Sequence, residues 1–361
     1  MSMHRKKAVV AMSGGVDSSV AAALLVEAGY DVTGIMLKLW RGDEINHDSG
    51  CCNVGAAEDA RRVADVLGIP FYVHNYAERF ADTVIRNFHD DYLSGRTPNP
   101  CVRCNQWIKF GTLLERASAL GADVLATGHY AQVRHERGRH RLFRGADPSK
   151  DQSYVLWMLG PGDLTRVRFP VGSMRKADTR ALAASLGLRT AAKPDSQEIC
   201  FVRGGDLDRY VDEQLAPAAA PGPIVDTAGK LVGEHRGIAR YTVGQRRGLG
   251  ISLGAPVFVT ALDAAGNTLT VGPRSALICR AATIAEVSLT DGRLHERMPI
   301  LVQYRAHGDV VPARLTMSEE HQARVEFEGP AEAVAPGQSA AFYSVDFPDE
   351  LLGGGIIAST E

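Results

Sequence analysis

The chain has 361 residues, of which 45% are hydrophobic and 23% are charged, a composition typical of a soluble globular protein with two or three domains. Its 40 basic and 42 acidic residues give a net charge of −2, so any site for a polyanion has to be a local patch. No apolar run reaches the roughly 20 residues of a membrane span, and the basic start at residues 1–7 precedes too short an apolar run for a signal peptide. We therefore expect a cytoplasmic protein with no membrane contact.

Short apolar runs and helical patterns alternate through the first 200 residues. Strands are predicted at residues 8–12, 31–39, 71–73 and 123–127. Helices are predicted at residues 16–27, 56–67, 77–93 and 109–120. This alternation indicates an α/β domain whose parallel sheet is covered on both faces and binds ligands at the carboxyl ends of its strands.

A different pattern begins after about residue 205. Residues 214–225, QLAPAAAPGPIV, are predicted to form a linker or long loop. Short β-like runs follow at residues 256–261, 268–271, 299–304, 323–328 and 339–343. We predict three domains: an α/β domain at residues 1–205, a β-rich domain at 206–275 and a β-barrel at 276–361.

The strongest local signal is VVAMSGGVDSSVAAALL, residues 9–25, in which a strand turns into an Ala-rich helix. Gly14 and Gly15 let backbone N–H groups approach an anion, and the helix N-terminus adds unpaired N–H groups and its positive dipole end. Asp17 can hold Mg²⁺ or cap the helix. The spacing matches neither a Walker A loop nor G-x-G-x-x-G. We predict a phosphate site, and the alternative is a tight strand–helix turn with a Ser or Asp cap.

Six cysteines in 361 residues are too sparse for a disulfide scaffold. Cys101 and Cys104 stand three apart in NPCVRCN, a spacing compatible with metal binding, disulfide exchange or a catalytic thiolate. Cys51 and Cys52 lie in a polar stretch that we interpret as a mobile surface loop rather than a metal or redox site. Cys279 lies in an apolar run and is predicted to be buried.

Several longer motifs follow the loop: GRTPNPCVRCNQWIKF (95–110), ATGHYA (126–131), KDQSYVLW (150–157) and KPDSQEICF (193–201). Others run to the end of the chain: YTVGQRRGLGI (241–251), QYRAH (303–307), PGQSAAFY (336–343) and LGGGII (352–357). In order and content they resemble the tRNA-specific 2-thiouridylase family, within the PP-loop ATP pyrophosphatase superfamily. The resemblance covers essentially the whole chain and implies an adenine nucleotide alpha hydrolase-like first domain.

The resemblance implies a chemistry. ATP, with Mg²⁺, adenylates the C2 carbonyl of the wobble uridine in the tRNA anticodon loop, and sulfur from a cysteine persulfide replaces the oxygen, giving 2-thiouridine, AMP and pyrophosphate. Cys104 matches the nucleophilic cysteine and Cys200 the persulfide-bearing one, which a sulfur-donor or relay protein must load. A thiol that attacks a persulfide releases its outer sulfur and leaves a disulfide, so two cysteines suit this reaction.

The resemblance also implies binding residues. Those matching ATP contacts are Ala11, Met12, Ser13, Gly14, Gly15, Val16, Asp17, Ser18, Leu37 and Gly128. Those matching the segment that meets the target base are Asn99, Pro100 and Cys101. Those matching other tRNA contacts are His129, Lys150, Asp151, Gln152, Tyr304, Arg305 and Gln338.

Other interpretations remain open from the sequence. Some family members carry an aspartate at the position of Cys101, and here Cys101, Cys104 and Cys200 together could instead ligate an iron–sulfur cluster that carries sulfide. Structural zinc lacks an obvious fourth ligand. Rival functions are an amide-forming PP-loop ligase, for which no ammonia source is evident, and a non-catalytic RNA-binding protein with a relic loop.

Two arginine-rich stretches are candidates for phosphate contact. Residues 134–145 hold five arginines and one acid, and residues 244–250 read GQRRGLG. The alternative for the first stretch is a solvated hairpin. Tyr304 and Arg305 combine a stacking ring with a guanidinium group, which suits RNA.

Overall fold

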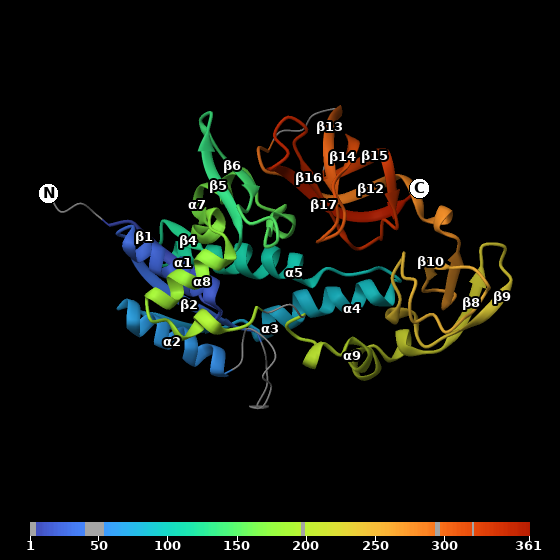
Figure 1. Cartoon of the computed structure of the whole chain (residues 1–361), viewed down its shortest axis with the longest axis horizontal. Helices are drawn as coiled ribbons and strands as arrows, with labels where there is room; N and C mark the ends of the chain where they lie inside the picture. Colours follow the sequence, from blue (N-terminus) through green and yellow to red (C-terminus); the bar gives the residue numbers. More distant parts are fainter. Residues whose placement is uncertain (1–4, 40–53, 196–198, 293–296, 320) are drawn as a thin grey trace.

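A computed structural model of the chain describes residues 5–39, 54–195, 199–292, 297–319 and 321–361. Cys51, Cys52 and the Ser196–Gln197–Glu198 part of the Cys200 motif lie outside these residues, so the loop expected around Cys51 is not tested. The described strands form three sheets: in Figure 1 the parallel sheet lies at one end of the molecule, the small sheet of β8–β11 at the other, and the barrel above the centre between them. Among the described residues, no helix is long and apolar enough to span a membrane.

The first sheet is parallel and has the strand order β3-β2-β1-β4-β7. Its strands are β1 (Lys7–Ala11), β2 (Asp31–Lys38), β3 (Phe71–Asn75), β4 (Val124–Ala126) and β7 (Val167–Arg168). Helices packed with this sheet include α1 (Val16–Glu27), α2 (Val54–Leu67) and α8 (Lys176–Ser185). Strands β2 and β3 are added on one side of β1, and β4 and β7 on its other side. The strand order therefore reverses between β1 and β4, which is the point where ligands bind in such sheets.

Two long helical stretches cross the centre of the molecule (Figure 1). The first comprises α3 (Ala77–Phe80), the π-helical η1 (Ala81–Ile85) and α4 (Arg86–Leu93). The second comprises α5 (Pro100–Arg103), the π-helical η2 (Cys104–Leu113) and α6 (Leu114–Ala119). The predicted start of the second stretch at residue 109 is wrong. The Asn99 side chain accepts a hydrogen bond from the Val102 N–H at 3.3 Å, and Pro100 takes the first helical position, so both cysteines of NPCVRCN lie on the helix.

The central domain is a small four-stranded sheet that follows α9 (Leu207–Gln214). Its strand order is β10-β11-β8-β9, from β8 (Gly222–Asp226), β9 (Leu231–His235), β10 (Phe258–Asp263) and β11 (Thr268–Gly272). The stretch predicted to be a linker at residues 214–225 is therefore partly ordered. It contains a short helix at Ala216–Ala219 and the start of β8, because Ile224 is fully buried in the core of this sheet.

The last domain is a closed barrel, in which β12 pairs with β15 on one side and β17 on the other. Its strands are β12 (Ile278–Leu289), β13 (Arg297–Gln303), β14 (Val311–Glu319), β15 (Gln322–Glu332), β16 (Ser339–Tyr343) and β17 (Glu350–Thr360). A hairpin from the first 205 residues, β5 (Ala131–Glu136) with β6 (Arg139–Arg144), extends this sheet by pairing with β17. The predicted fold class, an α/β domain followed by two β-rich domains of which the last is a barrel, is confirmed.

Candidate nucleotide and sulfur-transfer site

The predicted phosphate loop is a tight turn between β1 and α1. Gly14 has a φ of +72°, and a Cβ there would lie 2.2 Å from the carbonyl oxygen of Ala56, so only glycine fits. The loop is braced by its own serines: the Ser13 N–H donates to Ser18 Oγ at 3.2 Å, and Ser19 Oγ donates to the Gly15 carbonyl at 2.8 Å. These bonds leave an ordered helix N-terminus, the structure that suits an anion.

The loop after β4 meets the first turn of α1. A Cβ on Gly128 would lie 2.6 Å from the Ser18 nitrogen, so glycine allows the two segments to touch. Leu37 is buried near the end of β2. All the residues predicted to contact ATP thus gather along the carboxyl ends of β1, β2 and β4. Whether they bind ATP stays a prediction.

His129, one residue further on, is buried beside this loop. Its Nδ1 lies 2.6 Å from Thr127 Oγ1, and burial lowers the pKa of the imidazole well below its usual value, with Lys109 adding to the effect. A neutral, hydrogen-bonded ring is a structural group of the loop. The tRNA contact expected of His129 stays a prediction.

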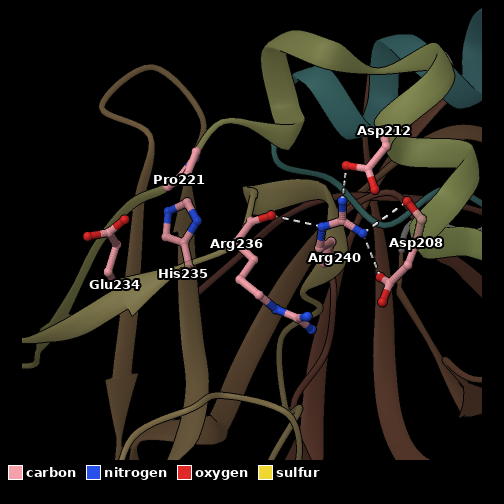
Figure 2. Close-up of a pocket in the computed structure, with 7 residues that line it drawn as sticks. All are labelled: Asp208, Asp212, Pro221, Glu234, His235, Arg236 and Arg240. Carbon is pink, nitrogen blue, oxygen red and sulfur yellow. Dashed lines mark hydrogen bonds and ion pairs between the residues drawn. The ribbon is translucent and has the colours of Figure 1, made fainter.

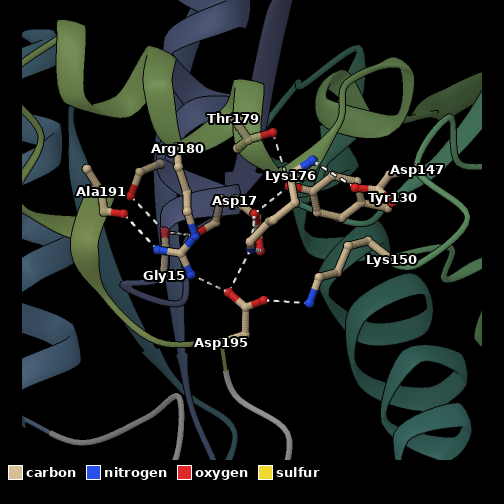
Figure 3. Close-up of polar contacts among 12 residues, drawn as sticks. Gly15, Asp17, Tyr130, Asp147, Lys150, Lys176, Thr179, Arg180, Ala191 and Asp195 are labelled. Carbon is tan, nitrogen blue, oxygen red and sulfur yellow. Dashed lines mark hydrogen bonds and ion pairs between the residues drawn. The ribbon is translucent and has the colours of Figure 1, made fainter.

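Asp17 sits at the centre of a polar network that the sequence reasoning missed (Figure 3). Lys176 Nζ donates to both carboxylate oxygens of Asp17 at 2.7 and 2.8 Å, and Tyr130 Oη donates at 2.8 Å. The Lys176 side chain is 11% exposed. Lys176 therefore pairs with both oxygens of this carboxylate, and the Mg²⁺ contact considered for Asp17 stays a prediction.

Asp195 connects this network to the segment that leads to Cys200. Its carboxylate is within 2.7–2.9 Å of Lys150, Lys176 and Arg180. Burial would raise the pKa of Asp195, but hydrogen bonds from Lys150 and Lys176 outweigh it and hold the pKa at about 2. Asp195 and Lys193 lie within the KPDSQEICF motif, which could have pointed to them as site residues. Lys176 and Arg180 lie on α8, outside every motif that the sequence analysis singled out.

Two of the cysteines, Cys104 and Cys200, belong to or pack against the largest hydrophobic core. Cys101 is exposed, whereas Cys104 is buried within this core. Cys200 is half-buried and packs against the same core, next to Phe201, whose ring lies 4.9 Å from that of Phe88. The fold therefore brings Cys104 and Cys200, distant in sequence, to one core. Cys279 is buried in the barrel, as predicted.

Within the described part of the chain, which includes Cys101, Cys104 and Cys200, no three His, Cys, Asp or Glu side chains are arranged to hold a metal ion. An iron–sulfur cluster ligated by these three cysteines stays a prediction.

Residues 150–152, predicted to contact tRNA, are engaged within the protein. Asp151 is buried and accepts hydrogen bonds from Arg144, from the Gly145 N–H, and from the N–H and hydroxyl of Ser153. Gln152 Oε1 accepts from the Tyr130 N–H at 3.0 Å. These residues tie the β5–β6 hairpin to the loop after β4, and their contact with tRNA stays a prediction.

The other expected tRNA contacts lie on the barrel. Tyr304 Oη accepts from the Glu332 N–H, and Arg305 donates to the carbonyls of Glu332 and Ala333, so the two side chains brace one barrel turn. Gln338 instead reaches out of the barrel, and its Nε2 donates to the carbonyls of Thr97 and Pro98 at 3.1 Å each.

The arginine-rich stretch at residues 134–145 is the β5–β6 hairpin. Arg141 is ion-paired with Glu350, and Arg144 with Asp151 at 2.7 Å. These two arginines join the hairpin to its surroundings rather than facing an RNA. Phosphate contact by the stretch at residues 134–145 stays a prediction.

A pocket of about 460 Å³ opens between α9 and the central sheet (Figure 2). Arg240 in its wall is ion-paired with Asp208 and Asp212, and His235 is fully buried and bonded to the Asn267 carbonyl. Arg240 and His235 are thus engaged within the protein, and none of the predicted site residues lines the pocket.

The fold and the loop define a nucleotide-activating enzyme of the PP-loop class with two appended β domains. Family models match in the same order: a tRNA methyl transferase HUP domain at residues 6–204, a tRNA methyl transferase PRC-barrel domain at 208–273 and an aminomethyltransferase beta-barrel domain at 280–357. The chain belongs to the tRNA-specific 2-thiouridylase family, as the sequence motifs indicated.

Curated relatives match over nearly their full length. The tRNA-specific 2-thiouridylase MnmA of Roseiflexus castenholzii is 49% identical over 370 residues, covering 98% of this chain and 99% of the relative. That of Chloroflexus aurantiacus is 49% identical over 356 residues, covering 98% of each chain. That of Geotalea uraniireducens is 48% identical over 362 residues, covering 98% of this chain and 95% of the relative.

Proposed function

We propose that this chain is an ATP-dependent tRNA-uridine 2-sulfurtransferase that replaces O2 of the wobble uridine by sulfur. The carrying observation is the end-to-end match to relatives named for 2-thiouridylation. A phosphate loop and two cysteines on one core, all within residues 6–204, support it. An amide-forming ligase would have no use for Cys104 and Cys200, and a non-catalytic RNA-binding protein would need neither them nor an intact loop.

The first half-reaction activates the base. The N–H groups of the loop and of the first turn of α1 bind the phosphates of ATP. Lys176, bonded to Asp17, and Lys193, whose Nζ donates to the Gly14 carbonyl at 3.0 Å, add positive charge beside them. Mg²⁺ held at Asp17 would neutralise charge on the departing pyrophosphate. O2 of the uridine attacks the α-phosphorus and pyrophosphate leaves.

The second half-reaction transfers sulfur. The uridine is turned out of its stack at a cost of a few kcal/mol and meets Asn99, Pro100 and Cys101. The outer sulfur of a Cys200 persulfide bonds to C2, and the Cys104 thiolate then attacks the inner sulfur of Cys200. The S–S bond of the persulfide breaks, AMP leaves, and a Cys104–Cys200 disulfide remains. A thiol reductant restores both thiols, and a sulfur-donor protein reloads Cys200.

One assay tests the proposal. Purified protein is incubated with ATP, Mg²⁺, a labelled persulfide donor and unmodified tRNA, and labelled 2-thiouridine is quantified after nuclease digestion. We expect Cys200→Ser and Cys104→Ser to abolish labelling. Cys279→Ser, at a buried barrel cysteine outside the site, is the matched control and should retain it. Normal labelling by Cys200→Ser would disprove the mechanism.

A further inference from the structure

Arg103 lies between the two cysteines of NPCVRCN, and its side chain is 7% exposed. Its guanidinium group makes a two-pronged ion pair with Glu286 of the barrel: Nη1 to Oε2 at 2.5 Å and Nη2 to Oε1 at 2.6 Å. Nε donates to Asn87 Oδ1 at 3.3 Å, Nη1 donates also to Gln106 at 2.9 Å, and the group lies over the Trp107 ring. The charged residue next to Cys104 is therefore held by an element far along the chain.

Glu286 is placed by a local distortion of β12. Its φ is +54°, in the left-handed region that a glutamate rarely adopts. The register of β12 against β17 shifts between Ala285 and Ser288, so the strand bulges at this residue. The hydrogen bond from Arg103 lowers the pKa of Glu286 against the opposing effect of burial. The strained backbone is compensated by a contact outside the barrel.

The barrel holds the same segment at a second point. Gln338 donates to the carbonyls of Thr97 and Pro98, and the Thr97 N–H donates to the Pro336 carbonyl at 2.8 Å. Residues 97–103, which span the predicted base-contacting segment and end beside Cys104, are thus anchored to the barrel at two points, strand β12 and the loop before β16.

We propose that Arg103 is a positioning residue for the nucleophile: the barrel, through Glu286, fixes the helical turn that presents Cys104. The expected change in kcat rests on the proposed function, whereas the expected change in the accessibility of Cys104 does not. An arginine is needed because its planar fork matches both carboxylate oxygens, which a lysine cannot do. Loss of Glu286 would leave Arg103 buried with its strongest partner gone, and the turn would shift to resolvate it.

The test compares Glu286→Gln and Arg103→Lys with Glu328→Gln. The control removes a carboxylate of the same barrel from an exposed pair with Arg314, 2.6 Å apart. Circular dichroism and melting establish which variants fold. Iodoacetamide labelling of Cys104, followed by peptide mass spectrometry, reports its accessibility, and steady-state thiolation separates kcat from KM for tRNA.

We expect both test variants to label Cys104 several-fold faster and to lower kcat about 10-fold, with KM for tRNA within about 2-fold of the parent. The control should change neither. Labelling rates and kcat values equal to those of the control would overturn the proposal. A change confined to a higher KM for tRNA would also overturn it, because it would indicate that Glu286 contacts tRNA. If the parent protein itself failed to thiolate tRNA, the labelling rates of Cys104 would still test whether Arg103 and Glu286 position the turn. Failure of the proposed function could therefore be distinguished from failure of this inference.

Discussion

The phosphate loop and the cysteine segment are built in different ways. The loop at residues 12–18 is shaped mainly by its own chain: a buried strand, a glycine at positive φ and serines that bond within the turn. The segment at residues 97–104 has a local helix cap, but its position depends on Glu286 and Gln338, which come from the barrel. The shape of the phosphate loop is thus encoded locally, whereas the cysteine segment contacts a domain more than a hundred residues away in the sequence.

The largest expected effect is a loss of ATP affinity on substitution of Gly14, but not of its neighbour Gly15. Gly14→Ala introduces a Cβ 2.2 Å from the Ala56 carbonyl oxygen at a φ of +72°, so the loop must rearrange. We expect ATP affinity, measured by calorimetry, to fall about 100-fold. Gly15→Ala is the matched control, because the nearest atom, Ser13 Oγ, lies 3.5 Å away. Equal losses in both variants would contradict the account of the loop.

Removal of a cation should come next in size. In Lys176→Met, Asp17 and Asp195 lose the ammonium group that they share. We expect about 10-fold weaker ATP binding together with a lower melting temperature. Lys150→Met is the comparison, since Lys150 contacts Asp195 but is not bonded to Asp17. If Lys150→Met weakened ATP binding equally, Asp17 would not be the relevant partner of Lys176.

A smaller effect is expected at the barrel contact with the cysteine segment. Gln338→Ala removes two hydrogen bonds to the carbonyls of Thr97 and Pro98, and we expect kcat for thiolation to fall about 3- to 10-fold. ATP affinity should be unchanged, which is the sharpest test of the comparison between the two regions. The exposed barrel residue Gln322 offers a control through Gln322→Ala. A parallel loss of ATP affinity in Gln338→Ala would show that the regions are coupled.

The smallest effect is a pH dependence at Asp195. Because its pKa is held at about 2 in the folded protein, below the usual aspartate value of 3.8, its contribution to stability is present above about pH 4 and is lost as pH falls toward 2. For a partly solvated group we expect about 1 kcal/mol. The free energies of unfolding of the parent and Asp195→Asn, measured in urea, should differ at pH 6 and converge as the pH approaches 2. A difference that is independent of pH would contradict the ion-pair assignment.

Some elements could be predicted because their signals are local. Helix α1 occupies Val16–Glu27 as predicted, since the glycine turn and the Ala-rich run specify both ends. The strand β17 carries three successive glycines and was not predicted. A Cβ on Gly354 would lie 2.7 Å from Trp157 Cβ, so glycine is needed there for close packing rather than for a turn. The need for glycine at such a position becomes visible only when the side chain packed against it is known.

The sequence by itself determined the family and the strand–turn–helix of the phosphate loop, and it predicted a cysteine chemistry, because strand–turn–helix signals and long motifs are contiguous in the chain. The tertiary structure decided what surrounds them. Tyr130 and Lys176 bond to Asp17, and Lys176 also pairs with Asp195, although these residues come from separate elements. Glu286 and Arg103 form an ion pair although 183 positions separate them in the sequence. Ion pairs between distant residues leave no periodic pattern in a sequence, because their geometry exists only after the sheet and barrel have packed together.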